Sequence, residues 1–349
     1  MNPEFDTSFI QNPDSRPNPN ISEAESIPLI DLSPLFTTPV NLTPLISEIE
    51  AACSNVGFFQ AINHGVPAEL LQRVQSAAKE FFALSTEEKS RVRRNEERFL
   101  GYYDTENTKN VRDWKEVFDF CVNDPMTVPT SSESGETAVQ QIRNQWPENP
   151  EGMRDACMDY AKAVEGLSFR LLELIAMTLN APAKRLNGYF EDSISRIRLN
   201  HYPPCPSPDL ALGVGPHKDQ GALTVLAQDD VGGLDVKRKY DGQWVRVKPV
   251  PNSYIINIGD LIQVWSNDKY ESTEHRVSVN SEKERFSIPF FLYPAHYTVI
   301  RPVEELVSED NPAKYNEFNW GHFFRSRMSS NFQKLGVENQ QIYHFRKKT

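Results

Sequence analysis

A succession of short apolar runs beyond Ser193 is the feature that most limits how this chain can fold. The runs are rich in β-branched and aromatic residues and are separated by turn-forming residues. They cover 194–199, 223–227, 234–236, 244–247, 254–258, 276–279, 286–292 and 297–300. About eight short strands at this spacing predict a β-barrel or a double-sheet jelly roll, and they argue against a parallel α/β sheet.

Helical patterns precede these strands. Apolar residues recur at helical spacing over 42–100 and predict two amphipathic helices, with a strand and turn between them at 57–66. A second helical pattern over 151–180 predicts one long amphipathic helix that packs on the sheet. The stretch 121–150 is rich in Pro, Ser, Thr, Asn and Glu, and we expect it to form a solvated loop.

These patterns divide the chain into five parts. They are a flexible leader (1–26), an N-terminal helical region (27–150), a long connecting helix (151–192), a β-rich core (193–302) and a C-terminal helical and loop segment (303–349). The leader lacks the basic and apolar stretches of a signal peptide, and no run of about 18 apolar residues occurs. We therefore expect a cytoplasmic protein that does not engage a membrane.

Charge and cysteine usage narrow the classes of partner. The formal net charge of −11 over 349 residues, with no concentrated basic stripe, makes nucleic acid an improbable partner. The four cysteines are scattered and form no Cys-x-x-Cys pair, so we expect reduced structural thiols. We expect a monomer whose partners are small molecules.

Three side chains suggest a metal site. In an extended chain, His217 and Asp219 emerge on the same face, because they are two residues apart. A third ligand must come from another strand, and His275 is the best candidate. Two histidines and one carboxylate occupy one face of an iron ion and leave the coordination positions of the opposite face open for a co-substrate and dioxygen. The spacing does not distinguish iron from zinc, which would indicate a hydrolase.

The residues after His275 strengthen the iron hypothesis. Residues 280–284 form a polar turn, and we predict a β-hairpin that returns Arg285 and Ser287 toward the metal. A guanidinium presents a planar fork to a carboxylate, and a neighbouring hydroxyl adds a hydrogen bond. The set therefore predicts a site for a small dicarboxylate.

Several motifs resemble those of the plant soluble 2-oxoglutarate- and Fe(II)-dependent dioxygenases, a family that includes flavonol synthases and gibberellin oxidases. They are IPLIDL at 27–32, GFF at 57–59, NHG at 63–65 and NHYPPCP at 200–206, followed by the metal and dicarboxylate residues. The resemblance extends over 27–302. It implies a distorted double-stranded β-helix, or jelly roll, wrapped by N-terminal and flanking helices.

The resemblance also implies roles for seven residues. The iron ligands would be His217, Asp219 and His275. The 2-oxoglutarate contacts would be Asn200, Tyr202, Arg285 and Ser287. The implied reaction is hydroxylation or desaturation of a small, largely apolar plant metabolite such as a hormone or flavonoid, with release of succinate and carbon dioxide and with ascorbate as a candidate iron reductant. The alternative is a non-catalytic small-molecule-binding or interaction protein that retains the fold.

Three further residues are candidates for the substrate pocket. Phe291 shares strand parity with Arg285 and Ser287, although core packing is nearly as good an account of it. Arg198 and Tyr293 stand where the flavonoid enzymes commonly carry Lys and Glu, which disfavours a flavonol synthase. The remaining histidines are expected to be structural: His64, His201, His296, His322 and His344.

Overall fold

Two β-sheets face each other across the centre of the molecule. The structure is a computed structural model, and it describes residues 5–17, 21, 23–24, 27–37, 41–133, 135–329 and 340–348. The large sheet has the order β2 (Leu29–Asp31), β3 (Phe58–Ile62), β15 (Tyr254–Ile258), β12 (Leu223–Gln228), β17 (Arg285–Leu292), β10 (Arg196–Tyr202), β7 (Glu116–Cys121) and β4 (Gly101–Tyr103). The small sheet has the order β1 (Glu23–Ala24), β14 (Trp244–Val247), β13 (Leu234–Lys237), β16 (His275–Ser278) and β11 (Leu212–His217).

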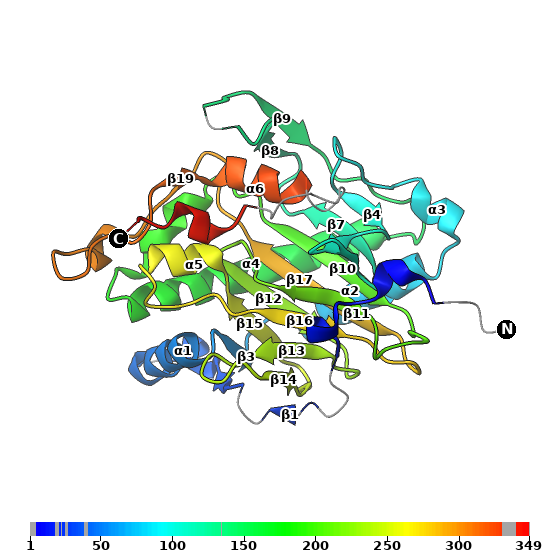
Figure 1. The fold of residues 1–349 in the computed structure, drawn as a ribbon, viewed down its shortest axis with the longest axis horizontal. Helices are drawn as coiled ribbons and strands as arrows, with labels where there is room; N and C mark the ends of the chain where they lie inside the picture. The colour runs from blue at the N-terminus through cyan, green and yellow to red at the C-terminus, as the bar shows by residue number, and fades with distance from the viewer. Residues whose placement is uncertain are drawn as a thin grey trace.

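This arrangement confirms the predicted jelly roll with flanking helices (Figure 1). Among the strands of the described residues, neighbours are antiparallel except for two pairs, β2 with β3 and β1 with β14. The core runs 194–199, 223–227, 234–236, 244–247, 254–258, 276–279 and 286–292 coincide with strands to within a few residues. The last run is shorter than predicted, because only Val299–Ile300 forms a strand, β18.

Helices cover the large sheet on the face away from the small sheet. Helix α4 (Met153–Thr178) lies against β12 and β17, and α1 (Thr43–Asn55) and α2 (Ala68–Phe82) pack against α4. The long apolar stripe predicted for 151–180 is buried in this contact; Leu171, Leu172 and Ile175 have no exposed surface. Burying each such side chain contributes roughly 1.5–3 kcal/mol. The helices therefore anchor the wall on which half of the site is built.

A second, smaller apolar cluster joins the two sheets. Phe58 and Tyr202 of the large sheet meet Leu234 and Val277 of the small sheet in it, together with Ile27, Val236, Val247 and Ile255. Strand β11 reaches this cluster through a glycine: a Cβ at Gly213 would lie 2.6 Å from the Tyr202 ring. Strand β11 was not predicted, because its two glycines and one proline are untypical of a strand.

The predicted hairpin over residues 275–287 is wrong. Strand β16 pairs with β11 and β13 in the small sheet, whereas β17 pairs with β10 and β12 in the large one. The polar residues 280–284 therefore cross from one sheet to the other instead of turning within one sheet. Arg285 and Ser287 consequently approach the site from the wall opposite His275.

Two other expectations need correction. The stretch 121–150 is not only a loop, because β8 (Met126–Pro129) and β9 (Val139–Ile142) form an antiparallel pair within it. The region 27–150, predicted as helical apart from a strand and turn at 57–66, supplies β3 there as expected and in addition supplies β2, β4 and β7 to the large sheet. Strand β7 pairs with β10, which lies far away in the sequence, and β4 joins the sheet only through β7. Local periodicity reveals neither strand, because their place depends on this long-range pairing.

The described part of the predicted flexible leader is held against the body of the protein. The rings of Phe5 and Phe9 lie 5.6 and 4.7 Å from the Trp114 ring, and the Gln11 backbone N–H donates to Leu210 O at 2.9 Å. The remainder of the leader prediction falls on 1–4, 18–20, 22 and 25–26, which lie outside the described residues. Over the ranges that the structure covers, no helix is both long and apolar enough to cross a bilayer.

Candidate active site

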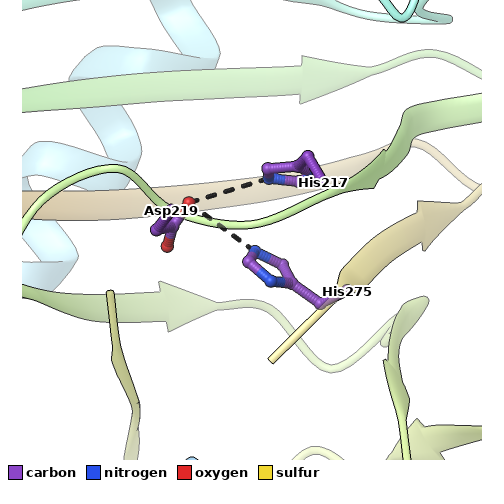
Figure 2. A group of neighbouring side chains, drawn as sticks. All are labelled: His217, Asp219 and His275. Carbon is purple, nitrogen blue, oxygen red and sulfur yellow. Dashed lines mark ion pairs between the residues drawn. The ribbon is translucent and has the colours of Figure 1, made fainter. Parts of the chain in front are cut away.

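The two predicted histidines and the predicted aspartate meet at one end of the small sheet. His217 ends β11 and stands opposite His275, the first residue of β16, while Asp219 lies two residues beyond β11. Asp219 Oδ1 is 3.7 Å from Nε2 of His217 and 3.7 Å from Nε2 of His275 (Figure 2). One ligand atom from each residue lies within 4.8 Å of the other two. This arrangement could hold a single metal ion on one side.

Hydrogen bonds orient these side chains toward a common point. His217 Nδ1 lies 2.8 Å from Gly215 O and His275 Nδ1 lies 3.2 Å from Thr273 O, so each Nδ1–H can donate to a carbonyl and leave Nε2 free. Asp219 Oδ2 accepts from Thr224 Oγ1 at 2.6 Å and from Asn257 Nδ2 at 2.8 Å. Only Oδ1 of Asp219 then faces the two imidazoles.

The loop that carries Asp219 is held by the start of α5 (Asp260–Trp265). Asp260 N donates to Asp219 O at 2.8 Å and Leu261 N donates to Gly221 O at 3.1 Å. The residue before α5 must be a glycine, because a Cβ at Gly259 would lie 2.2 Å from Gly221 O. The chain thus fixes the backbone on both sides of the carboxylate.

The protonation states also suit a metal. Burial and the neighbouring His275 lower the pKa of His217 to about 3, which keeps its imidazole neutral at ordinary pH. Burial alone would raise the pKa of Asp219, but attraction from His275 and His217 lowers it below its usual value. A neutral imidazole and an ionised carboxylate are the forms that bind metal ions.

A buried arginine lies on the opposite wall, on β17. Arg285 is 2 % exposed, and its Nη2 donates to Gln228 Oε1 at 3.1 Å. Its Nε and Nη1 have no hydrogen-bond partner in the described part of the chain. A buried guanidinium with idle donors is costly unless an anion meets them, so this position fits a ligand carboxylate.

The other three predicted co-substrate residues surround Arg285. Tyr202 stands opposite Arg285 across β10 and β17, with its ring 4.9 Å from the guanidinium. Asn200 stands opposite Ser287, and its Nδ2 donates to Ser287 Oγ at 3.3 Å. The side chains thus form a polar patch that faces the histidines across the gap between the sheets.

A cavity of about 910 Å³ occupies this gap and is lined by all ten site and pocket residues singled out from the sequence. That volume suits a small-molecule ligand together with a co-substrate. Ile342, Tyr343 and Arg346 from the C-terminal segment also line it. Among the predicted structural histidines, His64 accepts from Val66 N at 3.1 Å, and His201 lies between Glu116 and Glu284 at 2.7 and 3.0 Å.

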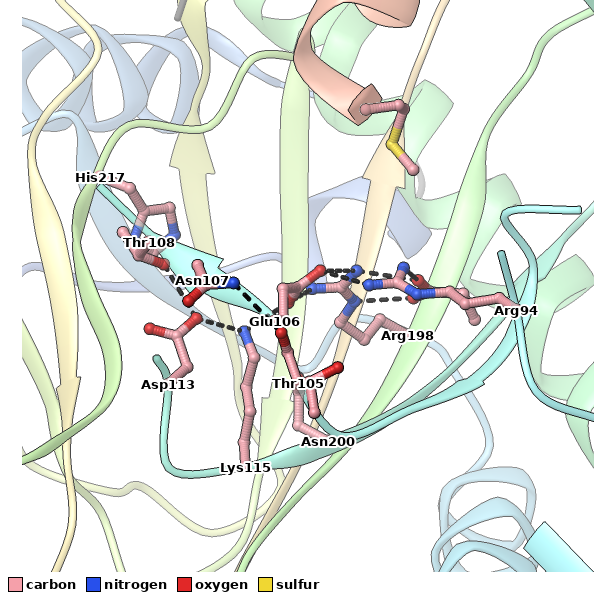
Figure 3. Close-up of polar contacts among 12 residues, drawn as sticks. Arg94, Thr105, Glu106, Asn107, Thr108, Asp113, Lys115, Arg198, Asn200 and His217 are labelled. Carbon is pink, nitrogen blue, oxygen red and sulfur yellow. Dashed lines mark hydrogen bonds and ion pairs between the residues drawn. The ribbon is translucent and has the colours of Figure 1, made fainter. Parts of the chain in front are cut away.

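Arg198 lines the cavity, but its hydrogen-bond donors are engaged (Figure 3). Nε and Nη2 donate to the Asp119 carboxylate at 2.7 and 2.8 Å, and Nη1 and Nη2 donate to the Glu106 carboxylate at 2.6 and 3.0 Å. Arg94 binds both carboxylates as well, and Lys115 joins Glu106 at 2.8 Å. Sequence reasoning missed this buried network, because its partners are separated by up to 92 residues.

Comparisons with known proteins identify the family. Residues 193–294 match the 2OG-Fe(II) oxygenase superfamily, and residues 27–149 match the family described as non-haem dioxygenase in morphine synthesis N-terminal. DMR6-LIKE OXYGENASE 2 of Arabidopsis thaliana is 37% identical over 88% of this chain and 85% of its own length. The chain belongs to the 2OG-Fe(II) oxygenase superfamily.

Two further relatives of this 2OG-Fe(II) oxygenase extend the comparison. Oxoglutarate-dependent flavonoid 7-O-demethylase 1 of Ocimum basilicum is 32% identical over 90% of this chain and 81% of its own length. The crystal structure of JOX2 in complex with 2OG, Fe and JA superposes with a TM-score of 0.79 at 32% identity, covering 97% of this chain and 91% of that one. The protein is therefore a 2-oxoglutarate-dependent dioxygenase that uses Fe(II).

Proposed function

We propose that His217, Asp219 and His275 hold Fe(II), and that Arg285 and Ser287 bind the distal carboxylate of 2-oxoglutarate. Asn200 and Tyr202 complete the co-substrate site. The observation that carries this proposal is the buried guanidinium of Arg285: two of its donors have no partner among the described residues, and Arg285 lines the same cavity as the three candidate ligands. A dicarboxylate that reaches from the metal to Arg285 would coordinate the metal at one end and accept hydrogen bonds from Arg285 at the other.

Bound Fe(II) and 2-oxoglutarate supply the oxidising chemistry, which consumes dioxygen, releases succinate and carbon dioxide, and oxidises the organic substrate. The protein chain positions the metal ligands and the co-substrate. Thr224 and Asn257 hold the Asp219 carboxylate, and Arg285 orients the co-substrate by a charge-assisted hydrogen bond. The two sheets and the C-terminal segment line the cavity around the reacting groups.

The substrate is a small, largely apolar plant metabolite, which the enzyme hydroxylates or desaturates. The plant relatives support this class, as does the JOX2 complex with a small-molecule ligand. Phe291 and Tyr293 line the cavity and offer an apolar wall opposite the metal site. The four cysteines are unpaired and buried, which supports a reducing compartment such as the cytoplasm. We propose in addition that the protein is a monomer.

Untargeted metabolite profiling tests this function. The Fe(II)-loaded protein is incubated in air with plant extract, with and without 2-oxoglutarate, and products are followed by mass spectrometry. We expect masses that gain one oxygen or lose two hydrogens only when 2-oxoglutarate is present, and no such masses with Asp219→Ala. A wild-type protein that binds iron and 2-oxoglutarate but changes no metabolite would instead support the non-catalytic binding alternative.

A further inference from the structure

Arg196 lies on the same face of β10 as the proposed co-substrate residues. Every second residue of this strand from Arg196 to Tyr202 lines the cavity. Asn200 and Tyr202 stand opposite Ser287 and Arg285, whereas Arg196 stands four residues before Asn200, opposite Phe291. Arg196 therefore extends the cavity wall away from the co-substrate end.

The sheet register places Arg196 within reach of a molecule held at the metal. Phe291 pairs with Arg196 on one side and with Thr224 on the other, and the Thr224 hydroxyl binds Asp219. Two strand spacings of about 4.8 Å separate the backbones of Arg196 and Thr224 by roughly 10 Å. A small organic molecule can span that distance.

The guanidinium of Arg196 lacks a full set of partners. The residue is 4 % exposed, and its Nε has no hydrogen-bond acceptor among the described residues. Its Nη1 lies 3.3 Å from Met328 Sδ, a weak acceptor, and 3.9 Å from Asp119 Oδ2. That carboxylate already accepts closer hydrogen bonds from Arg94 and Arg198. Arg196 is thus a buried cation with spare donors.

The surrounding network holds more positive than negative side chains. Four cations of the network, Arg94, Lys115, Arg196 and Arg198, share three carboxylates, Glu106, Asp113 and Asp119. Within the described chain, Arg196 is the member of this group with no carboxylate oxygen closer than 3.9 Å. A buried cation without a close counter-ion favours binding an anion.

The other cations around the cavity have partners. Lys109 is 3.0 Å from Glu274, Lys218 is 3.8 Å from Glu271, and Arg346 is 3.0 Å from Asp268. Arg327 lies near enough to Asp260 to favour its charged form. The positive charges of Arg285 and bound Fe(II) would be balanced by the negative charges of Asp219 and of the two carboxylates of 2-oxoglutarate. Among the cavity-lining residues that the structure describes, the unmatched positive charge therefore remains at Arg196.

Aromatic rings hold the Arg196 guanidinium in place. It lies 5.5 Å from the ring of Phe291, 5.6 Å from that of Tyr293 and 6.0 Å from that of Phe324. These rings also place apolar surface beside the charge. One fixed positive charge in an apolar wall suits a singly charged anion on a hydrocarbon frame; a phosphate would bring about two negative charges at neutral pH.

We infer that Arg196 binds a carboxylate on the organic substrate, so that the enzyme acts on apolar organic acids. This inference rests on the proposed oxygenase function and specifies its substrate class. The carboxylate accepts from the Arg196 guanidinium, and the frame of the acid runs past Phe291 toward the metal. Arg198, which we singled out from the sequence, then supports the wall rather than the substrate.

Affinity selection from a plant leaf extract tests the inference for an acid of any structure. The extract is divided, and one half is treated with trimethylsilyldiazomethane, which converts carboxylic acids into uncharged methyl esters. Each half is equilibrated anaerobically with protein, Fe(II) and fresh 2-oxoglutarate. Compounds retained with the protein on ultrafiltration are identified by mass spectrometry, and retained 2-oxoglutarate is measured in the same sample. Wild type is compared with Arg196→Met, Arg196→Lys and Arg73→Met, a surface control whose arginine is half exposed.

We expect wild type and Arg73→Met to retain carboxylic acids from the untreated half only. Arg196→Met should retain them at least roughly tenfold less, as expected for loss of a charge-assisted hydrogen bond. Arg196→Lys should recover part of the retention, and all four proteins should retain 2-oxoglutarate.

Equal retention from the esterified half, or by Arg196→Met, would overturn the inference, and so would a wild type that retains no acid. The esterified arm uses wild-type protein, so it stays decisive if Arg196→Met fails to fold. Failure of the proposed function has a different signature, because Fe(II)-dependent retention of 2-oxoglutarate would then be absent from every protein.

Discussion

At the level of single residues, the Asp219 carboxylate divides its two oxygens between support and ligand binding. Oδ2 accepts two hydrogen bonds, from Thr224 and Asn257, while Oδ1 faces the histidines. We expect Thr224→Val, which keeps the side-chain shape, to weaken Fe(II) binding about 10- to 100-fold. Anaerobic titration with Fe(II) measures this change.

Thr298→Val is the matched control for that substitution. Thr298 is 5 % exposed, similar to the 4 % of Thr224, and its hydroxyl bonds to Tyr189 O. It should leave the iron affinity unchanged. Equal Fe(II) affinity in wild type and Thr224→Val would show that Asp219 does not need this hydrogen bond to bind the metal.

Asp260 gives a prediction for the dependence of stability on pH. Burial raises its pKa from 3.8 to about 6, so the folded state binds this proton more tightly than the unfolded state does. Stability from this group is therefore full below pH 3.8 and is lost as the pH rises through 6. At pH values above that, Asp260→Asn should unfold with a free energy higher than wild type by up to about 3 kcal/mol.

Urea unfolding of the metal-free protein at several pH values checks this expectation. The advantage of Asp260→Asn should shrink as the pH falls below the pKa of about 6. Substitution of the exposed Asp310 by Asn should give no comparable advantage at any pH. An Asp260→Asn variant that is less stable than wild type above the pKa would show that the ionised carboxylate is stabilised by its surroundings.

The site residues differ in how far the sequence could reveal them. His217 and Asp219 were predicted as neighbours from their i, i+2 spacing. In the structure His217 ends β11, and Asp219 lies in the loop just beyond the strand. Arg196 was not, since its significance depends on carboxylates that Arg94 and Arg198 already occupy. Whether a buried arginine lacks a counter-ion can be judged only when the ion pairs of all its neighbours are known from the structure.

At the level of elements, β7 and β10 are tied by a buried ion pair. Arg198 and Asp119 stand directly opposite each other in the antiparallel ladder, and the Asp119 side chain has no exposed surface. Removing its charge leaves Arg94 and Arg198 buried beside a weaker partner. We expect Asp119→Asn to lower the free energy of unfolding by about 3–5 kcal/mol.

The exposed pair Arg73–Asp159 provides the comparison for Asp119. Its side chains are 50% and 55% exposed, so solvent screens the interaction. Asp159→Asn should cost less than about 1 kcal/mol in the same denaturation measurement. If the two substitutions cost the same, the buried network contributes no more to stability than a surface ion pair does.

The connection from β16 to β17 shows what local patterns leave undetermined. A polar turn between two apolar runs has the same sequence pattern whether the runs pair with each other or enter different sheets. Here β16 finds β11 and β13, and β17 finds β10 and β12. The position of the strands was predictable, but their partners were not, because pairing depends on long-range contacts.

At the scale of the whole molecule, the two sheets bring the two halves of the site face to face. The small sheet carries the histidines, the large sheet carries Arg285 and Ser287, and the cavity lies between them. The jelly-roll class was predictable from the succession of short strands. The strands that the N-terminal region adds to the large sheet were only partly visible, since β4 and β7 gain their partners from the tertiary fold.

Anaerobic equilibrium dialysis with Fe(II) and 2-oxoglutarate tests the assignment of the site most directly. Wild type, Asp219→Ala and Arg285→Met are compared in one series. We expect wild type to bind both components, Asp219→Ala to bind neither, and Arg285→Met to bind Fe(II) normally but 2-oxoglutarate at least roughly tenfold more weakly. Tight Fe(II) binding by Asp219→Ala, or unchanged 2-oxoglutarate binding by Arg285→Met, would contradict this account of the site.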